Sequence, residues 1–389
     1  MIRVGIIGAS PERGWAVRAH VPALRAVGGY ALTAVGTSRD ASAQEAARRF
    51  GADHAFTDPR ALAAHPEVDL VVIAVKVPAH AELVRCALEA GKHVLCEWPL
   101  ALDTTEAIAL TEAARGAGVV AATGLQTRFA PAIAYARDLI TEGHVGAVTS
   151  ATLLTTRTKG VDGGVPAWST YTLDRAKGAG SLEVIGGHAL DAIEYVLGEF
   201  AELSATLAVQ RPQLTVAETG QPVEVTSPDH IALHGMLAGG AIVSVHIRDA
   251  ETAPPRTRLE IAGTNGNLAI VSIGGASWEE IQFSVGDLGL RTTVGVEGAW
   301  RDLDIPQRYQ AASTISAPGA RNVSRLYERL REDLRTRQQL TPKFADGVHV
   351  HHVLDAIRQS AHTGTKQTPI PRSATTKAHC ASGFMSSYD

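Results

Sequence analysis

A histidine and a carboxylate three residues apart are the groups of this chain best suited to proton transfer. A helix that begins near Gly187, after a glycine-rich stretch, would place His188 and Asp191 on one face, at positions i and i+3. His188 could then act as a general base, with the carboxylate orienting its ring. An interior histidine bonded to the backbone would give the same pattern, so both interpretations stay open.

A second candidate lies where an apolar run, His93 to Cys96, meets Glu97, Trp98 and a proline. The pattern is typical of a buried strand that ends here. In open parallel sheets, ligands bind outside the carboxyl ends of the strands. An indole at position 98 could stack on a cofactor, but it could not transfer a proton.

A glycine-bearing turn lies between a predicted strand, Ile2 to Ile7, and a predicted helix that begins at Trp15. This arrangement points backbone N–H groups at a phosphate. The turn is longer than G-x-G-x-x-G allows and has Ser10 at the second glycine position, so an ordinary strand-to-helix turn is the alternative. The residues that would hold a dinucleotide here are Gly8, Ser10, Gly14 and Trp15.

The residues at the end of the next predicted strand indicate which dinucleotide, NAD or NADP, the chain would bind. A free ribose 2′-hydroxyl is usually held by an acidic residue, whereas a 2′-phosphate is better held by hydroxyls and an arginine. Thr37, Ser38 and Arg39 therefore favour NADP over NAD. A solvated surface turn is the alternative.

The segment after the third strong strand, Val75 to His80, would also face the ligand. Lys76 could be a partly desolvated amine able to transfer a proton, or it could only hold a phosphate or ribose. We favour the second role for Lys76, and we place Val75 and His80 at the cofactor as well.

These segments belong to a repeated alternation of strand and helix, which implies a parallel doubly wound sheet. The predicted strands are Ile2–Ile7, Tyr30–Thr37, Leu70–Val75, His93–Cys96 and Val119–Thr123, and the predicted helices are Trp15–Leu24, Ala41–Phe50, Ala81–Ala90 and Thr104–Ala117. From residue 146 onward, short alternating segments separated by glycine turns predict a large open mixed or antiparallel sheet. We therefore expect an α/β protein with a dinucleotide-binding domain over residues 1–125, a C-terminal α/β domain over residues 126–371 and a disordered tail over residues 372–389.

One face of the C-terminal sheet would need a cover, and few helices are predicted there, so we expect a homodimer or a higher homo-oligomer. A polar loop, Gly160 to Trp168, suits a segment that covers a substrate. His349, His351 and His352 lie in a helical pattern without an acidic residue at ligand spacing, so we expect packing there and no metal site.

The composition and net charge of the chain argue against several classes of function. The 389 residues are 45% apolar and carry a formal net charge of -4, which suits two globular domains and gives no field that would attract nucleic acid or an anionic membrane. No segment has the pattern of a signal peptide or approaches the roughly 18 apolar residues of a membrane span, and the three cysteines show no pairing pattern. We expect a cytoplasmic protein without a direct nucleic-acid partner or a membrane partner.

Seven short segments, in this order, resemble the glucose-fructose oxidoreductase and inositol dehydrogenase (Gfo/Idh/MocA) family over residues 2–371. They are the Gly8 turn, Val77–His80, Gly91–Val94, Glu97–Leu100, Arg128–Pro131, Gly187–Asp191 and the helix around Asp346–Gly347. The resemblance implies an N-terminal Rossmann domain and a C-terminal α/β domain with a large open sheet. Many family members oxidise or reduce sugars and polyols with NAD or NADP.

Within this family the chain resembles the branch of the fungal galactose-pathway repressor. The carrying segments are Gly14–Ala16 with His20, Val75–Pro78, Glu97–Trp98 and Pro228–His230. Proteins of that branch bind a dinucleotide and a partner protein. Family enzymes carry Glu-Lys-Pro where this chain has Glu97, Trp98 and Pro99, and an Asp four residues before the histidine, where Val184 stands.

Two hypotheses follow. The favoured one is an NADP-dependent oxidoreductase acting on a sugar, polyol or related hydroxy or carbonyl compound, in which His188 exchanges the hydroxyl proton and Lys76 or Glu183 assists. The other is a dinucleotide-binding regulatory protein without turnover, in which Trp98 stacks near the nicotinamide and a protein partner binds. We also place Gln126, Glu97 and Trp98 in the cofactor site, and Arg128, Trp168, Glu183 and His188 at the substrate.

Overall fold

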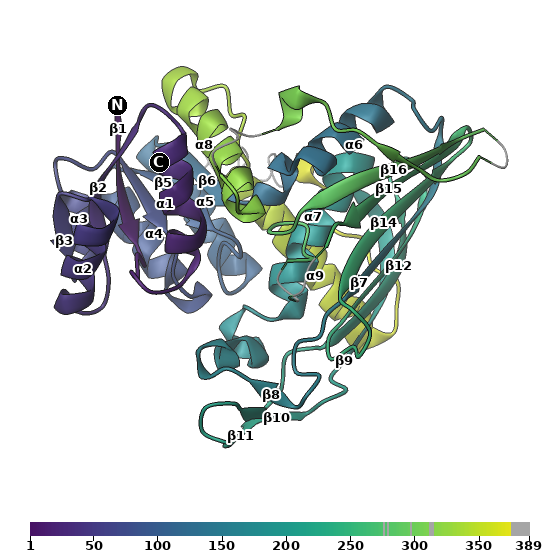
Figure 1. Cartoon of the computed structure of the whole chain (residues 1–389), viewed down its shortest axis with the longest axis horizontal. Helices are drawn as coiled ribbons and strands as arrows, with labels where there is room; N and C mark the ends of the chain where they lie inside the picture. The colour runs from purple at the N-terminus through teal and green to yellow at the C-terminus, as the bar shows by residue number, and fades with distance from the viewer. Residues whose placement is uncertain (275–276, 278–279, 296–297, 311–314, 375–389) are drawn as a thin grey trace, which may run out of the picture. The chain divides into compact units, whose positions relative to one another are not determined.

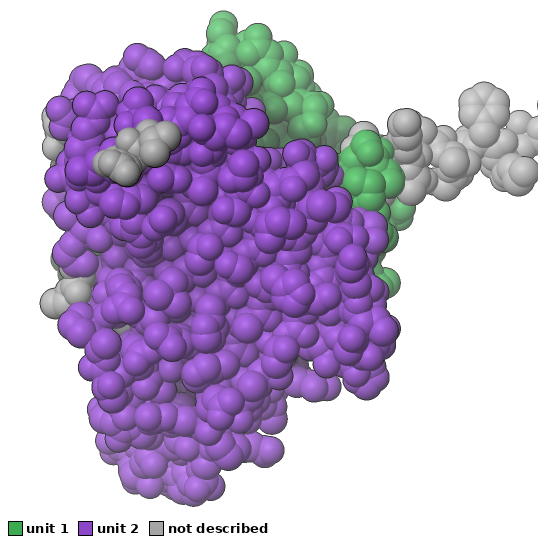
Figure 2. Space-filling model, turned by 90° about the vertical axis from the view of Figure 1, so that its right-hand side faces the viewer, with its two compact units in different colours: residues 1–125, 326–353, 370–389 green, residues 126–325, 354–369 purple. Residues whose placement is uncertain are grey.

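The computed structural model describes the chain except for residues 275–276, 278–279, 296–297, 311–314 and 375–389 (Figure 1). The chain divides into two compact units, which Figure 2 colours separately. Unit 1 comprises residues 1–125, 326–353 and 370–389, and unit 2 comprises residues 126–325 and 354–369. From residue 375 onward, the predicted disordered tail lies outside the described residues. None of the described helices is long and apolar enough to cross a membrane.

Unit 1 contains a six-stranded sheet in the order β3-β2-β1-β4-β5-β6, and every pairing in it is parallel. Its strands are β1 (Ile2–Ile7), β2 (Tyr30–Gly36), β3 (His54–Phe56), β4 (Leu70–Ile73), β5 (His93–Glu97) and β6 (Ala121–Gly124). All four residues of β4 are buried, because helices cover both faces of such a sheet and select continuous apolar runs. The alternation predicted a parallel doubly wound sheet, and the observed strand order is that of the Rossmann fold. The short β3 was not predicted.

The four predicted helices of unit 1 are present to within a few residues, with one difference in type, and the short α3 and η2 were not predicted. The helical segments are η1 (Ala16–His20), α1 (Val21–Ala26), α2 (Asp40–Phe50), α3 (Pro59–Ala64), η2 (Val77–Ala79), α4 (His80–Glu89) and α5 (Thr104–Ala117). The first predicted helix is a π-helical turn, η1, followed by the short α1. Two later helices, α8 (Pro318–Thr336) and α9 (Phe344–Thr363), contribute residues 326–336 and 344–353 to this unit.

Local capping fixes several of these ends. Asp103 precedes α5 and its Oδ1 accepts a hydrogen bond from the Glu106 backbone N–H at 2.8 Å. The helix ends at Gly118, whose φ of 65° is left-handed. The core beneath α4 and α5 includes Val84 and Leu110, and α9 adds Phe344 to it.

Unit 2 is built on an eight-stranded sheet in the order β17-β16-β15-β14-β7-β13-β12-β9. Its strands are β7 (Val148–Thr156), β9 (Phe200–Ala208), β12 (His230–Leu237), β13 (Ile242–Arg248), β14 (Arg256–Gly263), β15 (Gly266–Ser272), β16 (Leu288–Val294) and β17 (Arg301–Leu303). The pairing of β7 with β13 is parallel and the other pairings are antiparallel, so the sheet is mixed. Figure 1 shows α6 (Pro131–Thr141) and α7 (Gly187–Leu197) along one face.

Alternation along β13 shows how one face is buried. Val243, Val245 and Ile247 are 0 to 3% exposed, whereas Ile242 on the opposite face is 55% exposed. This period of two is the pattern of a sheet packed on one side only.

A three-stranded sheet, in the order β11-β10-β8, forms a second part of unit 2. Its strands are β8 (Gly164–Val165), β10 (Gln213–Val216) and β11 (Pro222–Glu224), and a small core of Val165, Leu173, Leu214 and Val225 lies against it. The segment 160–168, which we expected to be a loose loop, therefore contains a strand held by β10. It continues into the 3-10 helix η4 (Ala167–Leu173).

Candidate active site

The carboxyl ends of the strands of unit 1 carry most of the residues that the sequence places at a dinucleotide. The strand order reverses at β1 and β4, and a doubly wound sheet binds its ligand outside the carboxyl ends at that switch point. Gly8 follows β1, Ser38 and Arg39 follow β2, and Val75 and Lys76 follow β4.

Gly8 is required by both conformation and space. Its φ is +95°, and a Cβ built on it would lie 2.4 Å from the Ala74 carbonyl oxygen and 2.7 Å from Val75 Cγ1. The Gly8 and Ala9 N–H groups donate to the Gly36 carbonyl at 2.9 and 3.2 Å. The turn therefore brings bare backbone close to the neighbouring strand end, as phosphate-binding turns do.

The rest of the turn offers a further donor. The Trp15 indole Nε1 is buried and has no hydrogen-bond partner among the described residues. An unpaired buried donor costs about 1 to 3 kcal/mol and is rare in folded proteins, so it indicates an acceptor that binds there. Gly14 has a φ of +101° with no atom within 4 Å of a built Cβ. The Ser10 N–H already donates to the Gly8 carbonyl at 2.9 Å, so the Trp15 indole is the donor of this turn that could bind a dinucleotide pyrophosphate.

The end of β2 presents its polar side chains to solvent. Ser38 and Arg39 are exposed, and Thr37 Oγ1 donates to the Arg39 carbonyl at 3.0 Å. The Arg39 guanidinium makes no hydrogen bond or ion pair with the residues that the structure describes. Asp40, the nearest acid, is the first residue of α2.

Lys76 and His80 have contrasting surroundings. Lys76 is exposed, so it lacks the desolvation on which a proton-transfer role would depend. His80 is 1% exposed, with Nδ1 2.8 Å from the Pro99 carbonyl oxygen and Nε2 3.1 Å from the Val75 carbonyl oxygen, and burial lowers its pKa. We interpret His80 as the residue that holds the segment after β4 against the turn after β5.

Glu97 ends a buried hydrogen-bonded chain. Its Oε1 lies 2.9 Å from His20 Nε2, and His20 Nδ1 lies 2.8 Å from the Tyr327 hydroxyl. A Cβ on Gly124 would approach the Glu97 carboxylate to 2.8 Å, so the glycine leaves room for it. The carboxylate is therefore held in one position from two sides.

Trp98, the residue after Glu97, is 6% exposed. The peptide bond between Trp98 and Pro99 is cis. The Trp98 ring packs on His351 of α9, with ring centroids 5.0 Å apart and planes at 52°. His349, on the same helix, places Nδ1 3.1 Å from the Ile370 carbonyl oxygen. These histidines are packed within unit 1.

His188 of unit 2 lies at the start of α7, directly after the π-helical turn η6 (Ser181–Gly186). It is 5% exposed, and its Nδ1 lies 3.1 Å from Thr127 Oγ1. His188 also lines a small pocket with Thr155, Thr257 and Phe283 among its walls. The imidazole is thus held through Nδ1, as a general base requires.

Asp191 is fully buried and pairs with Arg128. The guanidinium donates from Nη2 to Oδ1 at 2.6 Å and from Nε to Oδ2 at 2.9 Å. A bidentate pair of this kind is rigid. It fastens η3 (Gln126–Phe129), which carries Thr127, to the helix that carries His188.

The other residues predicted at the substrate or cofactor, Glu183, Trp168 and Gln126, differ in their surroundings. Glu183 is 5% exposed and accepts from Arg358 Nη2 at 2.8 Å. Trp168 is 44% exposed at the start of η4, and Gln126 is 3% exposed, with its Oε1 lacking a hydrogen-bond partner among the described residues.

Sequence reasoning did not select Thr127 or Tyr327 for the site. Thr127 stands 61 residues from His188, and Tyr327 stands 307 residues from His20. The only signal for Thr127 was its place beside Arg128. Tyr327 lies in α8, which the sequence analysis did not predict.

Unit 1 contains a parallel sheet of the dinucleotide-binding type, and unit 2 contains a buried histidine. Two family models match the chain: residues 2–125 match the oxidoreductase family with an NAD-binding Rossmann fold, and residues 131–272 match the Gal80p C-terminal domain.

Similar proteins include both enzymes and a regulator. The chain is 34% identical to dehydrogenase aclE of Aspergillus oryzae over 61% of this chain and 67% of that protein. It is 28% identical to levoglucosan dehydrogenase of Pseudarthrobacter phenanthrenivorans over 82% of this chain and 84% of that protein. The crystal structure of a super-repressor mutant of Gal80p from Saccharomyces cerevisiae has a TM-score of 0.82 at 22% identity, covering 94% of this chain and 97% of that one. The chain belongs to the Gfo/Idh/MocA oxidoreductase family.

Proposed function

We propose that this protein is an NADP-dependent dehydrogenase or reductase that acts on a CH–OH group of a sugar, a polyol or a related compound. The observation that carries the proposal is the buried His188, held at Nδ1 by Thr127 at 3.1 Å. The sugar dehydrogenase among its relatives supports this substrate class.

The cofactor part of the proposal rests on unit 1. The Gly8 turn and the Trp15 indole would hold the pyrophosphate, and the exposed Arg39 would pair with a 2′-phosphate. The bound nicotinamide supplies the site that accepts or donates hydride at C4.

The proton part rests on unit 2. If Nδ1–H donates to Thr127 Oγ1, the Nε2 lone pair of His188 would be the base. In oxidation the substrate carbon loses hydride, its hydroxyl proton passes to Nε2 and a carbonyl forms. In reduction each transfer reverses. The Arg128–Asp191 pair fixes the position of Thr127 relative to α7, which carries His188.

Trp98 makes His188 more important than its counterpart in relatives with lysine at this position. An indole carries no exchangeable cationic proton, so no ammonium at position 98 shares the work. Orientation of the substrate would then account for a large part of the rate.

His188→Ala tests the proposal. We expect the variant to bind NADPH with unchanged affinity, measured by quenching of protein fluorescence, and to lose about 10²-fold or more in NADPH-linked turnover, because general base catalysis contributes about 10² to 10⁴. His234→Ala, a change on the exposed face of β12, serves as the matched control and should keep full activity.

The substrate screen must come first, with sugars, polyols and their carbonyl forms followed through NADPH absorbance. Equal activity of His188→Ala and the parent protein would remove His188 from the reaction. Tight NADPH binding without turnover of any compound would instead favour a regulatory protein, a function suggested by Trp98 and by the Gal80p-like second unit.

A further inference from the structure

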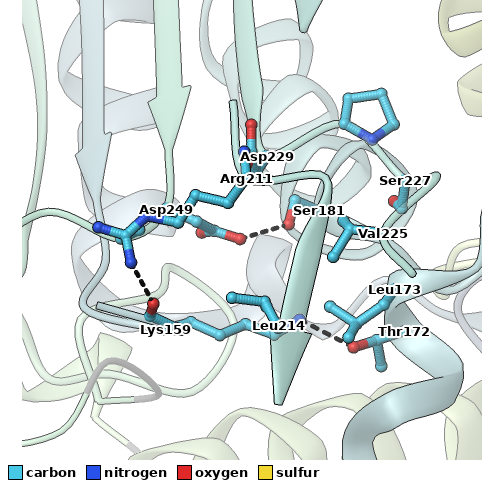
Figure 3. Close-up of a pocket in the computed structure, with 13 residues that line it drawn as sticks. Lys159, Thr172, Leu173, Ser181, Arg211, Leu214, Val225, Ser227, Asp229 and Asp249 are labelled. Atoms are coloured by element: carbon cyan, nitrogen blue, oxygen red, sulfur yellow. Dashed lines mark hydrogen bonds between the residues drawn. The ribbon is translucent and has the colours of Figure 1, made fainter. Parts of the chain in front are cut away.

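A second pocket lies in unit 2, and it includes none of the residues assigned above to catalysis (Figure 3). Part of its space is open to solvent. Its polar walls come from the segment after β7, from η4 and η6, from the segments before β10 and after β11, and from the residue after β13. The polar side chains that line it are Lys159, Thr172, Ser181, Arg211, Ser227, Asp229 and Asp249.

The two carboxylates of the pocket are already engaged within the protein. Asp249 accepts from Arg157 Nε and Nη2, each at 2.6 Å, and from Ser181 Oγ at 2.9 Å. Asp229 accepts from the backbone N–H groups of Gln210 and Arg211 at 2.8 and 2.9 Å. Neither carboxylate therefore depends on a cation from outside.

The two cations have capacity left. Lys159 Nζ donates to Thr172 Oγ1 at 2.8 Å, and Figure 3 shows its side chain extended across the pocket toward that hydroxyl. Thr172 is its only hydrogen-bond partner among the described residues, although an ammonium has three N–H groups. The Arg211 guanidinium uses Nη1 on the Gly160 and Val161 carbonyls at 2.7 and 2.9 Å, and the described residues offer no carboxylate partner to it.

Ser227 provides an independent observation. It is 3% exposed and lines the pocket, and its Oγ has no hydrogen-bond partner among the described residues. A Cβ on Gly180 would lie 1.8 Å from this oxygen, so any other residue at position 180 would displace the hydroxyl. A buried hydroxyl without a partner indicates a polar group that binds beside it.

The unused donors select the ligand. The charged lining residues are two cations, Lys159 and Arg211, and two carboxylates, Asp229 and Asp249, which already accept hydrogen bonds within the protein. The groups with hydrogen-bonding capacity left are therefore mostly donors. A small group that carries negative charge on oxygen would accept hydrogen bonds from these donors and pair with the cations.

We propose that this pocket binds a small oxyanion, a carboxylate or inorganic phosphate, through Lys159 Nζ and Ser227 Oγ, with Arg211 adding positive charge. Ser181 connects the pocket to η6, the turn that leads into His188, because its hydroxyl donates to Asp249 and it is the first residue of that turn. None of the residues that line this pocket is assigned to coenzyme binding or to the reaction.

The test is a calorimetric titration of the full chain at pH 7 and constant ionic strength, without coenzyme. Sodium phosphate and sodium lactate are the two probes, and sodium chloride is the blank. We expect saturable binding of at least one oxyanion and none of chloride. Lactate alone would identify a carboxylate site, and phosphate alone a phosphate site.

Two variants assign the binding to this pocket. Lys159→Met, which keeps the length of the side chain, should weaken it at least tenfold, and Ser227→Ala should weaken it about 2- to 10-fold, the value of one hydrogen bond. Lys177→Met removes an exposed lysine of the same unit that does not line the pocket, and should change nothing. The proposal is overturned if neither oxyanion binds the folded parent protein, or if Lys159→Met binds as the parent does.

Discussion

The side chains of Glu97 and Trp98 are adjacent in the sequence but have different structural roles. Glu97 is held by His20 and through it by Tyr327, whereas Trp98 is buried against His351. A lysine at position 98 would need a polar surrounding in place of that ring contact. The substitution is therefore part of a packed environment, and proton transfer has to be sought elsewhere, at His188.

Arg39→Ala tests the cofactor preference. The arginine is exposed and the described residues give it no ion-pair partner, so its loss should leave the fold unchanged. We expect the Kd for NADP to rise about tenfold, with the Kd for NAD unchanged, because charge-assisted hydrogen bonds contribute about 1.5 to 3 kcal/mol and an exposed site lowers that value. Fluorescence titration of both coenzymes measures the ratio.

Arg48→Ala provides the control for Arg39→Ala. Arg48 is an exposed arginine of α2 whose partner is Glu45, away from the end of β2. An NADP to NAD ratio that is the same in Arg39→Ala as in the parent would rule out the 2′-phosphate role.

Lys159 predicts a pH dependence of stability. Burial, reinforced by the neighbouring Arg157 and opposed by Asp249, lowers the pKa of Lys159 from 10.5 to about 8. Between pH 8 and 10.5 the unfolded chain therefore binds more protons at this group than the folded protein does, so this group makes the free energy of unfolding increase as pH rises.

The measurement is urea unfolding of the parent and of Lys159→Met from pH 7 to 10, in a buffer without oxyanions. The parent should gain stability relative to the variant above pH 8, and the other titrating groups cancel in the difference. A difference that stays constant across this range would show that Lys159 keeps an ordinary pKa.

Residue types could be predicted from the sequence, but their partners could not. The strand ends placed Gly8, Lys76 and Glu97 correctly at carboxyl ends, because a βα alternation fixes where each strand stops. The Thr127–His188 and Arg128–Asp191 contacts join segments about 60 residues apart, and only the packing of η3 on α7 determines them. The pairing of these side chains has no local signal.

At the scale of elements, long periodic segments were predicted well and short or polar ones were missed. The predicted bounds of α5 agree with the structure. β3 has three residues and gives too little pattern to detect. The omission of α8 was avoidable, because Val323, Leu326, Tyr327 and Leu330 are buried at helical spacing within a charged sequence.

The turn after β1 gives a prediction at this scale. Gly8→Ala adds both a strained φ and a clash with the Ala74 carbonyl, whereas Gly14→Ala adds only the strained φ. We expect Gly14→Ala to lower the free energy of unfolding by about 1 to 2 kcal/mol. Gly8→Ala should lower it by a further 1 to 3 kcal/mol or so, because the packed neighbours must move. Urea unfolding of both variants measures the difference, and equal losses would contradict the role of close approach.

The large sheet of unit 2 has one face with exposed apolar side chains, which bears on the assembly of the whole molecule. Ile242 in β13 is 55% exposed and Ile273, just after β15, is 58% exposed, although the opposite face of the sheet is buried. We predict that two copies of the chain associate through this face, because a broad one-sided sheet with exposed apolar side chains favours a symmetric partner.

Sedimentation of the parent protein at micromolar concentration should therefore show a dimer or a larger assembly. Ile242→Asp should shift it toward monomer, since the charge would be buried at the interface. Leu340→Asp adds the same charge at an exposed apolar residue of unit 1 and should not. A parent protein that sediments only as monomer would end this prediction.

The composition of unit 1 has a consequence for the order in which the chain can fold. Its sheet is complete at residue 124, yet its core uses Phe344 and Val348, and the Glu97–His20 chain ends on Tyr327. During synthesis, the core of unit 1 therefore cannot be completed when its last strand has been made. It can be completed only after more than 200 further residues have been synthesised. The first domain in the sequence is therefore among the last parts of the protein to reach its final form, and a chain cut short near residue 325 would lack the segment that closes it.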